Sequence, residues 1–178
     1  MAVFDEGALT YLDADGQVQE RFDWEMLRSG PVTLFRKPAV LAESVTWLER
    51  HDYTVAQADC ENCRSEEEVL WAIGGALAFY RWPCPGLDGF NDDCRYIKVP
   101  TKGGFAVVLH RFDAVAVAFP EFARHVLDIL ARESWYNLLF GRRLICMVRS
   151  EDLWIQFGPV GGCEPRWNWR EWSNADRV

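Results

Sequence analysis

Two aspartates, Asp88 and Asp92, stand four residues apart in a segment whose apolar residues have helical spacing. At about 100° per residue, their carboxylates lie roughly 40° apart on one face of a helix. The apolar stripe roughly opposite consists of Leu87, Phe90, Cys94 and Ile97. We therefore expect one side of this helix to pack against the core and the other to present negative charge to a cationic partner. An ordinary solvated helix face is the alternative interpretation.

The acidity of the chain is concentrated around this helix. The 178 residues contain 27 acidic and 19 basic side chains, a net charge of −8. Residues 59–93 contain eight acidic residues and two arginines, so this segment alone carries −6. A patch of one sign steers a partner of the opposite sign. Because nucleic acids and anionic membranes require clustered lysine and arginine, the composition argues against either as a direct partner.

The overall composition is that of a globular protein with its own core. Apolar residues make up 49% of the chain and aromatic residues 14%, and a chain of this length buries roughly 70% of its unfolded surface. No apolar run approaches the roughly 20 residues that cross a bilayer, and the first residues do not resemble a signal peptide. We therefore expect a cytoplasmic protein, without a cofactor or metal, whose six cysteines are free thiols.

The order of the expected elements indicates an α/β fold with a parallel sheet. Residues 8–12 and 17–22 alternate like strands around a turn, and residues 32–35 are a further candidate strand. Expected strands at 53–58, 105–109 and 144–148 are separated by helices that begin after Ser65, near Leu87 and near Pro120, and a helix at 39–50 precedes them. Such alternation is typical of a parallel sheet with crossover helices. Residues 153–157 are expected to add a strand before a tryptophan-rich tail.

The acidic helix resembles a known one. The sequence Leu-Asp-Gly-Phe-Asn-Asp-Asp-Cys at residues 87–94 resembles the Leu-Asp-Ala-Leu-x-Asp-Cys-Leu helix of the barstar family, intracellular inhibitors of barnase-type ribonucleases. The order of elements over residues 40–150 fits the same family. The resemblance implies three parallel strands flanked by helices over residues 39–150. The rest of the chain extends beyond it, as a β-rich N-terminal extension at 1–38, expected to pack on the core, and a tryptophan-rich C-terminal extension at 151–178.

The resemblance also implies a function and a set of contact residues. In that family two helix aspartates, here Asp88 and Asp92, enter the nuclease active site. Carboxylates suit this role because a ribonuclease site is built of arginine, lysine and histidine for phosphates. The chain is therefore expected to be an immunity protein that binds a basic ribonuclease or related toxin. The other expected contact residues are Asn91, at a position where the family has tryptophan, together with Asp93, Trp82, Tyr80 and Glu133.

Two other functions remain open at this stage. Cys60 and Cys63 stand where a thioredoxin-like redox pair would, although the three glutamates that follow raise rather than lower a thiol pKa. A scaffold that associates through its tryptophan-rich tail is the other alternative. Zinc is disfavoured because a second closely spaced cysteine pair is missing. His51, His110 and His125 have no catalytic motif around them, and no glycine-rich phosphate loop is present, so we do not expect an enzyme.

Overall fold

The computed structural model describes residues 10–12, 18–79 and 86–172. Its main sheet contains five parallel strands in the spatial order β4-β5-β6-β3-β7. These strands are β3 (Val32–Phe35), β4 (Tyr53–Asp59), β5 (Gly104–His110), β6 (Leu144–Arg149) and β7 (Arg166–Trp167). A separate antiparallel pair is formed by β1 (Thr10–Leu12) and β2 (Val18–Glu20). The α/β class and the parallel sheet expected from the sequence are confirmed.

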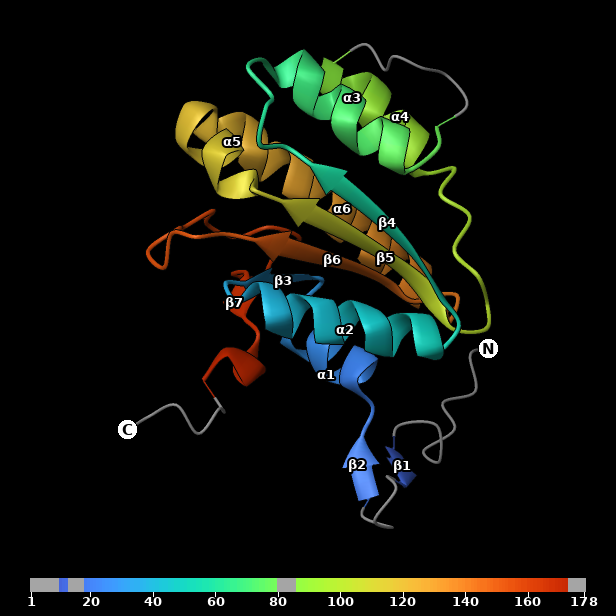
Figure 1. Cartoon of the computed structure of the whole chain (residues 1–178). Coiled ribbons are helices and arrows are strands. Elements are labelled where there is room, and N and C mark those ends of the chain that lie inside the picture. Colours follow the sequence, from blue (N-terminus) through green and yellow to red (C-terminus); the bar gives the residue numbers. More distant parts are fainter. Residues whose placement is uncertain (1–9, 13–17, 80–85, 173–178) are drawn as a thin grey trace.

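Helices cover both faces of this sheet (Figure 1). They are α1 (Phe22–Ser29), α2 (Pro38–Arg50), α3 (Glu66–Ala76), α4 (Gly86–Cys94), α5 (Phe112–Ala118) and α6 (Pro120–Leu138), followed by the short 3-10 helix η2 (Trp169–Glu171). Helices α1 and α2 bury one apolar cluster against the sheet, and α3 to α6 bury a larger one on the opposite face. The continuous burial of β5 and β6 follows from this arrangement, because a strand covered on both faces has no solvent side.

The sheet has five strands rather than the three expected. Strand β3 comes from the segment assigned to an N-terminal extension, yet it pairs with β6 on one side and β7 on the other. All four of its residues are buried. Strand β7 comes from the tryptophan-rich tail and has only two residues, too few to give a periodic pattern. Both segments therefore contribute hydrogen bonds to the main sheet, and the boundaries at residues 38 and 150 stay predictions.

Three local expectations differ from the structure. The N-terminal segment is less rich in strands than expected, since residues 22–29 form α1, whose Phe22, Met26 and Leu27 are buried at helical spacing. Residues 153–157 form turns and irregular backbone instead of a strand. Helix α5 was not anticipated, because its small apolar residues continue the pattern of β5. Helices α2, α3, α4 and α6 begin close to their expected positions.

Helix α3 begins at the capping motif that its sequence indicates. The Ser65 hydroxyl accepts a hydrogen bond from the Glu68 amide at 3.2 Å. The Glu68 carboxylate accepts one from the backbone amide of Arg64, one residue before the cap. Amides at the start of the helix are thereby satisfied, which fixes the point from which α3 leads toward α4. Among the described residues, none of the helices is both long and apolar enough to cross a bilayer.

A buried carboxylate joins α1 to the sheet. Asp23 is fully buried, and its carboxylate pairs with Arg21 at 2.8 Å and with Arg143 at 3.5 Å. The same carboxylate accepts a hydrogen bond from the Tyr53 hydroxyl at 2.8 Å. Arg143 also donates to the carbonyl of Gly103, at 2.8 Å from its Nε. The start of β4, the start of β6 and the turn before β5 are therefore held together by one charge network.

Substitution Asp23→Asn is expected to lower the free energy of unfolding by about 3–5 kcal/mol, because it strands buried guanidinium groups that have lost their counter-charge. Tyr53→Phe removes a single neutral donor and is expected to cost about 1 kcal/mol. Urea unfolding of the two variants measures the difference. Equal losses would show that the hydrogen bond, and not the charge of Asp23, stabilises this junction.

Candidate partner-binding site

Helix α4 is fixed to the core by its apolar face. Phe90 and Cys94 are 0% and 1% exposed. The Phe90 ring lies 5.9 Å, between centroids, from the ring of Phe79. Because these two anchors set the rotation of the helix about its axis, Asp88 and Asp92 are both exposed on the solvent side. The structure thus places the two aspartates as the sequence predicted.

The acidic face also carries a cation that the sequence analysis did not include. A guanidinium nitrogen of Arg95 lies 3.7 Å from a carboxylate oxygen of Asp92, and both side chains are more than 60% exposed. Such exposed pairs contribute about 0.2–1 kcal/mol. The i,i+3 spacing of the two residues was readable in the sequence. Asp92 is therefore partly neutralised in the free chain, by an ion pair weak enough to be exchanged.

Asn91 and Arg132 connect this face to α6. The Arg132 guanidinium donates to the side-chain oxygen of Asn91 at 3.1 Å and pairs through Nε with Asp128 at 3.3 Å. Arg132 is therefore held on both helices at once. This link involves Asn91, one of the positions at which the sequence departs from the expected barstar-like pattern. The pairing spans 41 positions in sequence, and no local pattern would have revealed it.

Glu133 belongs to the same surface. It is half-buried on α6, and this burial raises the pKa of its carboxyl group above the ordinary value, while the charges of Arg95 and Arg132 act in the opposite direction. The influence of these two arginines places Glu133 in the electrostatic neighbourhood of α4. Glu133 therefore lies within electrostatic reach of Arg95, which pairs with Asp92, and of Arg132, which donates to Asn91.

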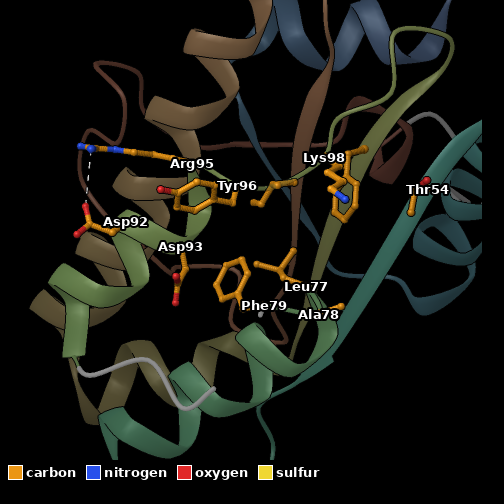
Figure 2. A pocket seen from close by; sticks show the side chains of 11 residues that line it. Thr54, Leu77, Ala78, Phe79, Asp92, Asp93, Arg95, Tyr96 and Lys98 are labelled. Carbon is orange, nitrogen blue, oxygen red and sulfur yellow. Dashed lines mark ion pairs between the residues drawn. The ribbon is translucent and has the colours of Figure 1, made fainter. Parts of the chain in front are cut away.

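A hollow of about 930 Å³ adjoins the acidic face (Figure 2). Asp92 and Asp93 of α4 stand on one side of it, with Asp93 half-buried. Leu77 and Phe79, at the end of α3, lie across from them. The remaining lining residues come from the segment after α4 and from the first residues of β4 and β5: Arg95, Tyr96, Ile97, Lys98, Thr54 and Phe105, together with Ala78. The site therefore combines a convex acidic helix with a concave, partly apolar surface beside it.

Two of the expected contact residues, Tyr80 and Trp82, lie outside the described residues. The remaining five, Asp88, Asn91, Asp92, Asp93 and Glu133, lie on α4 and the adjoining part of α6. Arg95 and Arg132 join them. The described surface thus contains four carboxylates and two guanidinium groups, and it remains acidic.

The cysteine pair has a different environment. Burial, with Cys63 and Asp59 nearby, raises the pKa of the Cys60 thiol to about 12. Burial and the carboxylate of Glu68 raise the pKa of Cys63 as well. A nucleophilic thiol needs a lowered pKa, so neither sulfur has the electrostatics of a redox catalyst.

Comparisons with known proteins give a fold and no family. No family model matches the chain, and no curated protein matches it. A chain of the solved structure "Structure of Drosophila ORC bound to DNA" is similar in fold, with a TM-score of 0.51 and 14% sequence identity. The match covers 76% of this chain and 35% of that chain, so the present sequence spans about a third of the solved one. At this identity the likeness concerns the fold alone.

Substitution Glu133→Gln is expected to stabilise the chain at neutral pH and to leave its stability nearly unchanged below pH 4.5, the ordinary pKa of this group. The folded chain binds this proton more tightly than the unfolded chain, so the stability linked to it is present below the ordinary pKa and lost as pH rises through the folded one. Urea unfolding of both proteins at the two pH values measures it. If the difference in unfolding free energy between the variant and the original chain were the same at both pH values, desolvation of the Glu133 carboxylate would be contradicted.

The thiols of Cys60 and Cys63 are expected to react with iodoacetamide more slowly at neutral pH than free cysteine does, because both pKa values are raised. The rate for each residue is read by mass spectrometry on the peptide that contains it, in variants in which the other is serine, because four further cysteines remain in the chain. A thiolate that titrates below neutral pH in either variant would restore the oxidoreductase interpretation.

Proposed function

We propose that this chain is a barstar-like inhibitor, an immunity protein that blocks the active site of a basic ribonuclease or related toxin with the acidic face of α4. The observation that carries the proposal is the exposure of Asp88 and Asp92, one turn apart, on a helix anchored by Phe90 and Cys94. A rigid pair of carboxylates loses little conformational freedom when it binds. In this role it occupies the positions at which the nuclease holds the phosphates of RNA.

The ion pair between Asp92 and Arg95 is compatible with this role. An exposed pair of this kind is worth about 0.2–1 kcal/mol, whereas close charge pairs across the barnase–barstar interface, the complex on which this proposal is based, have coupling energies of about 1.5–7 kcal/mol. An arginine from the nuclease therefore replaces Arg95 at Asp92 with a net gain. Arg95, once released, remains at the rim, where it contacts solvent or a carboxylate of the partner.

Other features of the surface favour the same kind of partner. The segment 59–93, which carries −6, includes both α3 and the aspartates of α4, so a basic protein is steered toward α4. The hollow beside Asp93 gives a projecting side chain of the partner a place to bury apolar area. The DNA in the ORC structure does not suggest DNA as a partner here, because the same segment repels a polyanion.

The oxidoreductase alternative has weaker support, since the raised pKa values of Cys60 and Cys63 oppose thiolate chemistry. An association domain that binds through the tail makes a different prediction from the inhibitor. For that domain, deletion of residues 163–178 abolishes association and Asp88→Ala has no effect. For the inhibitor, substitutions on α4 abolish binding.

Substitution Asp92→Ala is expected to weaken binding to the cognate ribonuclease by about 2–5 kcal/mol, partly because it strands a buried cation of the partner. The measurement is calorimetry against catalytically inactive variants of the barnase-type ribonucleases encoded by the source genome. Association with the unsubstituted chain is expected to slow as salt rises, because exposed charges are screened. The proposal fails if none of these nucleases binds or if binding is independent of salt.

A matched control for this variant is Glu121→Ala. Glu121 is also an exposed carboxylate that pairs with an arginine at i,i+3, namely Arg124 at 3.0 Å. It stands eleven positions before Arg132 on α6, roughly 16 Å along the helix axis. Glu121→Ala removes the same charge from the chain and is expected to leave affinity within about 0.5 kcal/mol of the original value. Equal losses for both variants would indicate net charge rather than a specific site.

A further inference from the structure

A second, smaller hollow lies at the other edge of the sheet. Strand β4 forms one edge and β7 the other, and α4 packs on α3, which lies on β4. The second hollow has a volume of about 220 Å³ and is lined by Trp167 of β7, Leu34 of β3 and residues of the segment that follows β6. It therefore shares no residue with the acidic face of α4.

The lining of this hollow combines aromatic surface with a carboxylate. Its lining includes two almost completely buried side chains, Leu34 and Phe157, which are 3% and 7% exposed. It also includes two tryptophans, the exposed Trp154 and the half-buried Trp167, and the exposed carboxylate of Glu164. The negative face of an indole ring attracts a cation, and a nearby carboxylate strengthens that attraction. Quaternary ammonium ions are weakly hydrated, and a lysine side chain carries a methylene chain, so both can contact the aromatic and aliphatic groups of this lining.

We propose that the hollow between Trp154, Trp167 and Glu164 is a binding site for an alkylammonium group, such as the head of a lysine side chain or a quaternary ammonium ion. Its volume is below the roughly 300–1,000 Å³ of sites for drug-sized ligands, so it fits one side-chain head rather than a larger molecule. The net charge of −8 favours a cationic occupant over an anionic one.

The segment that carries Trp154 is held in place without the ligand. The Trp154 amide donates to the Asp152 carboxylate at 2.8 Å, and the Asp152 amide donates to the Ser150 hydroxyl at 3.0 Å. The amide of Glu151 donates to Asp113 at 2.9 Å, which ties the segment to α5. Trp154 is nevertheless 86% exposed. The indole ring of Trp154 is therefore accessible to a ligand, and its backbone does not have to be ordered when the ligand binds.

This site does not depend on the proposed inhibition of a nuclease. Either can be absent while the other is present, because Glu164 and Trp154 are on the segment after β6 and Asp88 and Asp92 are on α4. A test with small cations in the absence of any nuclease therefore reports on this site alone.

The experiment is an NMR titration of the full chain that follows the indole N–H signals of Trp154 and Trp167. The probes are choline and Nα-acetyl-lysine methylamide, which represent the quaternary and the lysine source. The control ligand is 3,3-dimethylbutan-1-ol, a neutral molecule with the shape of choline. We expect at least one of the two cations to shift both indole signals in a saturable way, with an affinity about tenfold higher than that of the neutral alcohol.

Two substitutions separate the contribution of an indole ring from that of the carboxylate. Trp154→Ala is expected to weaken binding of the cation at least about tenfold, and Glu164→Gln about threefold or more. Both residues are exposed, so neither variant is expected to unfold. Matched controls are Trp71→Ala on α3, where Trp71 is 42% exposed, and Glu121→Gln on α6. These two variants are expected to bind as the original chain does.

Each outcome decides the proposal. Preference for choline assigns the site to quaternary ammonium ions, and preference for the lysine derivative assigns it to lysine side chains. Equal binding of the neutral alcohol would overturn the proposal in favour of a purely apolar hollow. Absence of any saturable shift, or shifts unaffected by Trp154→Ala, would overturn it as well.

Discussion

The rotation of helix α4 about its own axis is the constraint on which the account of the site depends. Phe90 and Cys94 are both completely enclosed, and a helix with two such anchors one turn apart has a single rotational setting. Asp88 and Asp92 then stand on the solvent side because Phe90 and Cys94 pack on the other, and the exposed ion pair of Asp92 with Arg95 adds only a weak contact. The placement of both carboxylates on this face is thus set by packing on the opposite face of the helix. A substitution that loosened Phe90 would displace both of them.

The features of this site that could be identified from the sequence are those that depend on residues a few positions apart. Helical spacing gave the apolar stripe and the aspartate pair, and the Ser65 capping motif gave the start of α3. Arg132 could not be found in this way, since its hydrogen bond to Asn91 joins residues 41 positions apart. Arg95, by contrast, is a local partner of Asp92, because the i,i+3 spacing of the two residues is visible in the sequence.

The same distinction explains the sheet. Strands β4, β5 and β6 have six or seven residues each, which is enough for a pattern of apolar residues. The two additional strands are short, and β7 pairs with β3 through only two residue pairs. Their membership in the sheet is decided by tertiary contacts, including the carboxylate of Glu171, which accepts hydrogen bonds from the amides of Arg36 and Lys37 just after β3. Patterns within a segment contain no information about such contacts.

The two ends of the sheet thus present different chemistry. At the β4 edge, α4 offers carboxylates on a convex surface beside a large hollow. At the β7 edge, the lining of a small hollow includes two tryptophans and a single carboxylate. Under the two proposals both bind cations, and they differ in geometry: the first takes guanidinium groups that the partner arranges for phosphates, and the second takes one isolated ammonium head. A protein with this charge distribution can engage a basic partner at one edge while the other edge remains accessible.

The central claim is that α4 takes the place of RNA phosphates, and the kinetic mode of inhibition tests it most directly. The rate of RNA cleavage by a cognate ribonuclease would be measured over a range of substrate concentrations at several fixed concentrations of this chain. The account predicts competitive inhibition, in which the apparent KM rises with the concentration of the chain and kcat stays constant. A fall in kcat at constant KM would place the chain away from the phosphate positions and would contradict the account.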